Sequence, residues 1–385
     1  MSTYSLLSAG RTFGGTGSIE QIKTVAADLG ATRALIISDQ GVARAGLLAK
    51  PKALLEAAGV AVSVIDSTPP EPDVAQVEAI LASASAQSYD LVVGIGGGSA
   101  MDVAKIVAVL LTSDVALRDL LRGKATIAKR GVPTLMVPTT AGTGSEATPN
   151  SIVLVPEDEL KVGIVSAKLI PDGVILDPEM TVGLPPAITA STGMDALTHA
   201  IECYMSKKGS PFSELFALKA ITLITRSIRR AYAQGGDLAA RHDMLLGAYY
   251  GGMCIATSST TAVHALAYPL GGKYRIPHGV SNAILLPYVM RFNGVGNEDK
   301  FRDVALAMGL PVADKSAAAA TEAVIAALFA LNRDLSIPAD LKPWNITAAD
   351  LETLVDGAAK VTRLLDNNPR AMSRADIAAI YTQLV

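Results

Sequence analysis

The stretch DLVVGIGGGSAMDVAKIVAVLLT, Asp90–Thr112, decides the fold. It begins with a short β-branched run that ends in glycines, and it continues with the apolar spacing of a helix. This order predicts a buried strand, a tight glycine turn and a helix. A helix that starts at such a turn offers free N–H groups and the positive end of its dipole, which suits a pyrophosphate. The turn alone is weak evidence, because Ser99 stands where G-x-G-x-x-G has its last glycine, and a tight turn without a ligand has the same composition.

The surrounding sequence repeats the alternation of strand and helix. Strand-like runs occur at 33–39, 60–66 and 133–137, and helical patterns lie between them, as at 74–88. Such alternation predicts a parallel sheet with right-handed crossovers. After about residue 184 the patterns are mostly helical, at 185–206, 213–233, 237–256, 260–270, 298–309, 316–333 and 348–365. The sequence therefore predicts an α/β dinucleotide-binding domain over 1–184 and an all-α domain over 185–385.

Composition excludes several classes of protein. The 385 residues are 50% hydrophobic and 18% charged, and the formal net charge of −3 gives no sign of a face for nucleic acid or for an anionic membrane. The first residues lack the pattern of a signal peptide, and no apolar run has the length of a membrane span. Two cysteines, Cys203 and Cys254, are too few for a disulfide framework. A cytoplasmic protein is the simplest interpretation.

Two further strand ends carry groups that suit a nucleotide. Asp39 ends the strand at 33–39, where an acid can bond the adenine-ribose hydroxyls of NAD and repel the phosphate of NADP; an aspartate there also suits a helix N-cap. The segment VPTTAGTGSEATPNS, Val137–Ser151, offers the hydroxyls of Thr139, Thr140 and Thr143. Open α/β sheets bind ligands at the carboxyl ends of their strands, so these loops favour a binding site over an ordinary polar surface loop.

The helical stretch at 185–206 carries two groups that are costly to bury. Asp195 and His199 are four positions apart, so they share one helix face. His264 opens another apolar helical stretch, and His278 follows between a proline and a glycine, in a chain with only four histidines. Each residue alone also fits an ordinary core or capping role. Together, three imidazoles and a carboxylate form a complete ligand set for a divalent first-row metal, but they do not distinguish Fe(II) from Zn(II), Mn(II) or Co(II).

Four motifs in this order resemble the iron-containing (group III) alcohol dehydrogenases: GGGSAMDVAK, PTTAGTGSE, STGMDALTHAIE and HALAYPLGGKYRIPHGVSNAILLP. The similarity runs from about Phe13 to the C-terminus. The resemblance implies a dehydroquinate synthase-like fold, with a dinucleotide-binding α/β domain, an all-helical metal-binding domain and an active site in the cleft between them. It also implies a homodimer or larger homo-oligomer that uses NAD and Fe(II), with Zn(II) as the alternative, to interconvert a small alcohol and its aldehyde.

The resemblance assigns roles by position. Asp195, His199, His264 and His278 match the family's metal ligands. The cofactor matches are Asp39, which favours NAD, Gly97, Gly98, Ser99 and Asp102 at the pyrophosphate turn, Thr139, Thr140 and Thr143 beside the nicotinamide, and Asn150 and Lys161 as further contacts.

One position departs from the family pattern. Many members read H-x-x-x-H at the third motif, and the second histidine lies near the substrate and can relay a proton. Tyr268 stands there in this chain. A phenol with a pKa near ~10 is a poorer base at neutral pH, so a catalytic role and a packing role for Tyr268 both remain open.

Other interpretations also remain open. A lyase of the dehydroquinate synthase type would use NAD only transiently, although the flanks of His264 and His278 match the dehydrogenases better. A reductase or transhydrogenase of a carboxylated substrate, such as a hydroxy acid or maleylacetate, could bind the carboxylate through Arg275, for which a surface ion pair is the simpler role. A protein that binds NAD and metal without catalysis is the third alternative.

Overall fold

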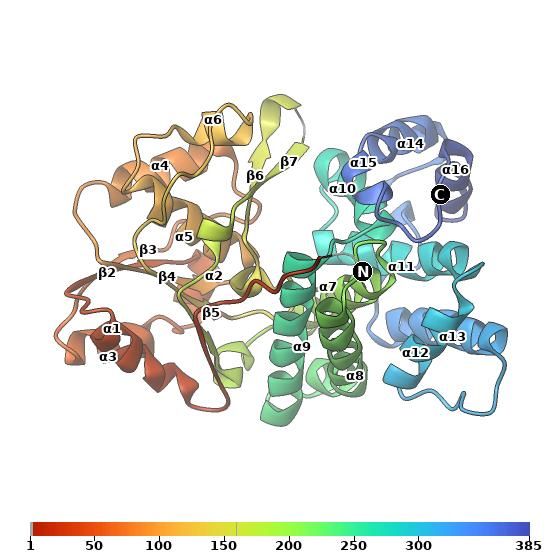
Figure 1. Cartoon of the computed structure of the whole chain (residues 1–385), viewed down its shortest axis with the longest axis horizontal. Helices are drawn as coiled ribbons and strands as arrows, with labels where there is room; N and C mark the ends of the chain where they lie inside the picture. The colour runs from red at the N-terminus through yellow and green to blue at the C-terminus, as the bar shows by residue number, and fades with distance from the viewer. Residues whose placement is uncertain (1–2, 159) are drawn as a thin grey trace. The chain divides into compact units, whose positions relative to one another are not determined.

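The computed structural model describes residues 3–158 and 160–385, which divide into two compact units. One unit is Leu7–Leu184, and the other is Pro185–Val385 together with the N-terminal segment through Leu6 (Figure 1). Among the described residues, no helix combines the length and the apolar character that crossing a membrane requires.

The first unit is built on a parallel sheet, as predicted. Its strands are β1 (Arg11–Gly14), β2 (Arg33–Ile37), β3 (Ala61–Ile65), β4 (Leu91–Gly96), β5 (Thr134–Pro138) and β8 (Gly173–Leu176), in the order β1-β8-β5-β4-β2-β3. The strand-like runs of the sequence correspond to β2, β3, β4 and β5. The sequence did not predict β1 and β8, because four residues carry too little alternation to stand out. It also did not predict the antiparallel hairpin of β6 (Asn150–Val155) and β7 (Leu160–Val165).

Helices cover both faces of the sheet (Figure 1). On one face, α1 (Ile22–Asp28) and α3 (Ala49–Ala57) share a core with alternate residues of β2, β4 and β5. On the other face, α5 (Gly98–Leu110) packs on the same strands, with α4 (Val74–Ala84) beside it. The short helices α2 (Gln40–Arg44) and α6 (Leu117–Leu121) complete the unit. Two covered faces explain why the central strands β4 and β5 are buried along their whole length.

The direction of strand order changes between β2 and β4. The chain goes from β2 outward to β3, and from β4 to β5 on the other side. The helices that follow β2 and β4 therefore leave on opposite faces, and the carboxyl ends of these two strands stay open between them. In doubly wound sheets this is the position at which ligands bind.

The second unit is all-helical, as predicted. Its helices are α7 (Pro186–Met205), α8 (Pro211–Ala233), α9 (Leu238–Thr257), α10 (Ala262–Tyr274), α11 (His278–Gly294), α12 (Glu298–Ala307), α13 (Ala317–Asp334), α14 (Leu351–Ala359), α15 (Thr362–Leu365) and α16 (Arg374–Thr382). α7 packs against α8, α9, α10 and α11. The helical pattern at 348–365 is divided into α14 and α15. Two helices were not predicted: α11, which contains Pro287, and α16.

Candidate functional site

Three helices place the four candidate metal ligands. Asp195 and His199 lie one turn apart on the buried side of α7 and are 2% and 5% exposed. His264 is the third residue of α10 and is also buried, whereas His278 is the first residue of α11 and its side chain is 31% exposed. His278 is therefore the most exposed member of the set.

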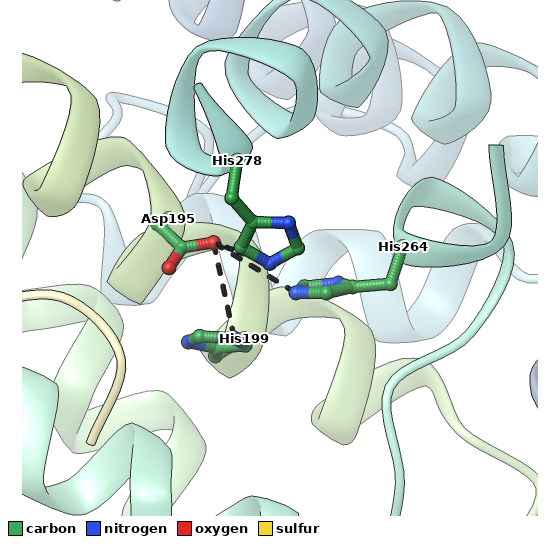
Figure 2. Close-up of side chains that lie close together, drawn as sticks. All are labelled: Asp195, His199, His264 and His278. Atoms are coloured by element: carbon green, nitrogen blue, oxygen red, sulfur yellow. Dashed lines mark ion pairs between the residues drawn. The ribbon is translucent and has the colours of Figure 1, made fainter. Parts of the chain in front are cut away.

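Figure 2 shows the three imidazoles around one carboxylate oxygen. The Nε2 atoms of His199 and His264 each lie 3.8 Å from Asp195 Oδ1, and His278 Nε2 lies 3.7 Å from it. One ligand atom from each residue falls within 4.8 Å of all the others. The rings of His199 and His264 are stacked, with centroids 4.7 Å apart.

The spacing of these atoms fits a divalent cation. The nitrogen–oxygen distances are too long for direct hydrogen bonds. Atoms that each lie about 2.1 Å from one ion are roughly 3–4 Å from each other, and the three nitrogen–oxygen distances fall in this range. One carboxylate oxygen and three imidazole nitrogens are also a set of donor atoms that first-row metals prefer.

Two more buried side chains contact the ligands. Asn282, on α11, donates from Nδ2 to Asp195 Oδ1 over 2.7 Å, and the same Nδ2 lies 3.1 Å from His264 Nε2 and 3.2 Å from His278 Nε2. Glu202, on α7, lies 2.5 Å from His264 Nδ1 through Oε2. Both side chains are completely buried, so their polar atoms depend on partners within the protein.

The electrostatics follow from these contacts. Burial opposes ionisation of Asp195, but the three histidines and Asn282 outweigh it and lower the pKa of the carboxyl group below its usual value. Burial also disfavours the charged form of His264, but Glu202 and Asp195 outweigh it and raise the pKa of the imidazole. The cluster therefore favours an anionic Asp195 and attracts a positive charge, which a metal ion can provide.

Tyr268 lies one turn beyond His264 on α10, a spacing that puts both residues on one helix face. Its surroundings raise the pKa of the phenol above 10: burial is the main cause, and nearby Arg363 opposes it. At neutral pH the side chain is therefore a neutral hydroxyl group.

In the first unit, the predicted cofactor residues of two loops come together. The N–H of Thr139 donates to the carbonyl of Gly96 over 2.9 Å. A Cβ added to Gly98 would meet the Thr143 side chain at 2.8 Å, and one added to Gly97 would meet Thr140 at 3.5 Å. Gly96 has φ +156°, which L side chains rarely adopt. The glycines therefore allow residues 96–98 after β4, the glycine turn, to lie directly against residues 139–149, the threonine loop.

Asp39 lies beside the same turn. Its Oδ1 accepts from the N–H of Val42 over 3.0 Å, so it is the N-cap of α2. Its Oδ2 would lie 3.2 Å from a Cβ placed on Gly96. The capping interpretation of Asp39 is thus confirmed, and one carboxylate oxygen faces the glycine turn.

Asp102 takes part in a buried network of hydrogen bonds and one ion pair. Its carboxylate accepts from Ser145 Oγ and from the N–H of Ile152 at 2.9 Å, and it lies 3.0 Å from Lys105 Nζ. Lys105 is fully buried and also donates to the carbonyl of Ser145 over 2.9 Å. This buried ion pair fastens α5 to the threonine loop and to the hairpin of β6 and β7.

The remaining candidates lie around the hairpin. Asn150 is the first residue of β6, and Lys161, on β7, pairs with Glu71 Oε1 over 2.5 Å. The N–H of Glu71 in turn donates to Ser99 Oγ over 3.1 Å. Glu71 therefore links Ser99, which its backbone N–H contacts, to Lys161, which its carboxylate contacts.

Sequence reasoning missed four buried charged or amide side chains near the candidate sites: Glu202, Asn282, Lys105 and Glu146. Glu202 lies three residues after His199 in an apolar helix, so it is a second buried acid that the same argument could have identified. Lys105 lies three residues after Asp102, and Asn282 lies four residues after His278, so helix spacing offered a signal for both. Their other partners, and the surroundings of Glu146, come from elements far away in the sequence.

Comparisons with known proteins agree with this geometry. Residues 9–178 match the family model described as iron-containing alcohol dehydrogenase, and residues 189–385 match the C-terminal model of the same family. The chain is 40% identical over 369 residues to long-chain-alcohol dehydrogenase 1 of Geobacillus thermodenitrificans, covering 95% of this chain and 93% of the relative.

Solved structures agree as well. A crystal structure of 1,3-propanediol oxidoreductase superposes with a TM-score of 0.95 at 35% identity, over 100% of both chains. The sulfoacetaldehyde reductase of Bifidobacterium kashiwanohense in complex with NAD⁺ gives 0.91 at 30% identity, over 100% of this chain and 98% of the other. The chain therefore belongs to the iron-containing alcohol dehydrogenase family and is an oxidoreductase of the NAD-linked alcohol dehydrogenase or aldehyde reductase type.

Proposed function

We propose that this chain interconverts a small primary alcohol and its aldehyde with NAD, using Fe(II) held by Asp195, His199, His264 and His278. The observation that carries the proposal is the convergence of these four side chains, each with one ligand atom within 4.8 Å of the others. When bound, the ion supplies a Lewis acid for the alcohol oxygen, and NAD supplies the hydride chemistry. Fe(II) is proposed over Zn(II) because of the family, since the donor atoms suit both.

The residues of the first unit would position the cofactor. Gly97, Gly98 and Ser99, at the start of α5, would direct free N–H groups at the pyrophosphate. The Asp39 carboxylate beside the turn would accept from the ribose hydroxyls and disfavour NADP. The threonine loop, with Thr139, Thr140, Thr143 and the adjacent Asn150, would hold the nicotinamide end, with Lys161 as a further contact. Asp102 would hold the threonine loop in position, because its carboxylate accepts a hydrogen bond from Ser145 Oγ.

Tyr268 would act on the substrate as a hydrogen-bond donor. Its raised pKa leaves the hydroxyl proton in place at neutral pH, which makes it a poor general base. The names of the compared proteins include a long-chain alcohol, 1,3-propanediol and sulfoacetaldehyde, so unbranched primary alcohols and aldehydes are the substrate class to test first.

A carboxylated substrate is the second candidate. Arg275 is exposed, ends α10 with φ +54° and lies three residues before His278. A cation at this position could bind an acid group of the substrate. The described contacts of Arg275 are those of a helix cap, so the uncharged substrate remains the first proposal.

The test is an assay of the purified protein after metal removal. NADH absorbance is followed with primary alcohols, diols, hydroxy acids and aldehydes, each with and without Fe(II) or Zn(II) under anaerobic conditions. NADH change that depends on Fe(II) and is fastest with an unbranched alcohol or aldehyde supports the proposal. A preference for hydroxy acids would favour the second candidate, and bound metal without any NADH change would favour a lyase or a binding protein. The variant His278→Ala should lose metal and turnover together.

We also propose a cytoplasmic homodimer or larger homo-oligomer. Two free, buried cysteines are consistent with a reducing compartment, and the oligomer follows from the family resemblance alone. Light scattering after size-exclusion chromatography would determine the assembly directly.

A further inference from the structure

We infer that Glu202 is a positioning residue that fixes the tautomer of His264 and thereby makes its Nε2 atom available as a ligand. This inference rests on the metal role proposed above for His264. Glu202 is outside the ligand set, and its side chain acts on the metal site through the histidine.

The contacts of Glu202 form a fixed arrangement of donors and acceptors. Oε1 accepts from Thr261 Oγ1 over 2.7 Å and from the N–H of Val263 over 2.6 Å. Oε2 lies 2.5 Å from His264 Nδ1. Glu202 comes from α7, whereas all three partners lie at the start of α10, so one carboxylate caps the first turn of that helix and holds the ring of its third residue.

This arrangement determines which ring nitrogen carries the proton. Thr261 and Val263 direct their donors to one carboxylate oxygen, and the ionised carboxylate has only acceptor atoms to offer at the other. A neutral His264 must therefore carry its proton on Nδ1, and the lone pair lies on Nε2.

The opposite edge of the ring is consistent with this tautomer. Asn282 Nδ2, a donor, lies 3.1 Å from His264 Nε2. The same amide nitrogen carries two protons and also contacts Asp195 Oδ1 and His278 Nε2, and an unprotonated His264 Nε2 can accept one of the two. The carboxylate at Nδ1 thus directs the lone pair at the cluster, and carboxylate–histidine pairs of this kind typically strengthen metal binding by about 10–100-fold.

The isosteric variant Glu202→Gln makes a sharp prediction. The Val263 N–H can only donate, so the new amide must place its oxygen there and its NH₂ group toward His264 Nδ1. Nδ1 then becomes the acceptor, and the ring proton moves to Nε2. Nε2 then has no free lone pair with which to bind a metal. We expect the Kd for Zn(II) to rise by about 10–100-fold in this variant.

The closing experiment uses two readouts on the full chain. Nitrogen-15 spectra of histidine-labelled, metal-free protein report the tautomer of each ring, and the four histidines are assigned by single substitutions. Zn(II) affinity is measured by competition with a chelator. The wild type should show Nδ1–H at His264 and the variant Nε2–H. Thr261→Val is the matched control: it removes one donor to the same carboxylate, so it should lower thermal stability but keep the wild-type tautomer and the wild-type Kd within about 3-fold.

The outcomes separate the two proposals. An Nε2–H tautomer in the metal-free wild type, or a Glu202→Gln variant with unchanged tautomer and unchanged Kd, would overturn the role of Glu202. If the wild type binds no Zn(II) or Fe(II), the proposed function fails, and the spectra alone decide the role of Glu202. If Glu202→Gln does not fold, the tautomer of the wild type still gives the decision.

Discussion

At the scale of single residues, buried ionisable side chains mark the places where this protein departs from a simple apolar core. Glu146 is such a group: it is 1% exposed and lies in the threonine loop, between Ser145 and Ala147. Burial raises the pKa of its carboxyl group to about 7, nearby Asp102 adds to the effect, and Lys105 opposes it. The protonated form is therefore favoured in the folded chain.

This shift makes stability depend on pH in a defined direction. The unfolded carboxyl group has a pKa of 4.5, so between pH 4.5 and about 7 the folded chain holds a proton that the unfolded chain releases. The contribution of Glu146 to the free energy of unfolding therefore falls as pH rises through this range, by about 3 kcal/mol in total. Above this range the contribution does not change further. Glu146→Gln should be more stable than the wild type at pH 8 and equal to it near pH 4.5. Thermal unfolding midpoints across this range check the prediction. The exposed Glu56→Gln is the control, and an advantage of Glu146→Gln that does not change with pH would contradict the argument.

Tyr268 supports a second prediction at this scale. A general base contributes about 10²–10⁴-fold to a rate, whereas a hydroxyl group that only donates a hydrogen bond contributes less. Because the pKa of this phenol is raised, Tyr268→Phe should keep kcat within about 10-fold of the wild type and mainly raise KM. Steady-state kinetics with the best alcohol measures both constants. A 100-fold loss of kcat would show that Tyr268 relays the proton after all.

At the scale of helices, the ligand cluster depends on how closely α11 approaches α7. Gly279 directly follows His278, and a Cβ added there would lie 2.2 Å from the backbone oxygen of Ser191 and 3.3 Å from Asp195 Cβ. The obstacle is backbone, which cannot rotate away as a side chain can. The glycine thus permits the contact that brings His278 to Asp195.

Gly279→Ala should therefore separate the two helices. Overpacking of this kind costs about 1–3 kcal/mol, and the shift moves His278 away from the other ligands. We expect a lower unfolding midpoint and a weaker affinity for Zn(II). Gly236→Ala, in the same unit, is the control, because a Cβ there meets nothing within 4 Å. Normal metal affinity in Gly279→Ala would mean that the cluster tolerates a displaced α11.

Local sequence pattern predicted part of the fold and of the site, and packing between helices determines the rest. The strands β2 to β5 are β-branched runs next to strong turn signals, so pattern was sufficient, whereas β1 and β8 are four residues each. Asp195 and His199 were identifiable because they share one helix face, and His264 and His278 because histidine is rare in this chain. The bonds from Glu202 to His264 and from Asn282 to Asp195 join residues 62 and 87 positions apart. They exist only because α7 packs against α10 and α11, which local pattern does not encode.

At the scale of the whole molecule, the candidate residues for NAD and those for the metal ion belong to different compact units. Asp39, the glycine turn and the threonine loop lie within Leu7–Leu184, and all four metal ligands lie within Pro185–Val385. In the described residues, the contacts that shape the glycine turn come from its own unit: Thr140 and Thr143 pack on it, and the ion pair of Asp102 and Lys105 fastens the threonine loop beside it. The turn therefore keeps its shape through groups other than the metal ligands.

Metal removal should consequently abolish turnover but leave NAD binding in place. After treatment with a chelator, NADH formation from the best alcohol should fall to background, while the Kd for NADH, measured by its fluorescence, should stay within about 3-fold of the value for the metal-loaded protein. Readdition of Fe(II) should restore the rate. Asp39→Asn tests the converse: it should weaken NAD binding without changing the Zn(II) affinity, because its carboxylate lies beside the glycine turn and outside the unit that holds the ligands. If NADH affinity is lost together with the metal, the metal also shapes the cofactor site, and the two groups bind as one coupled system.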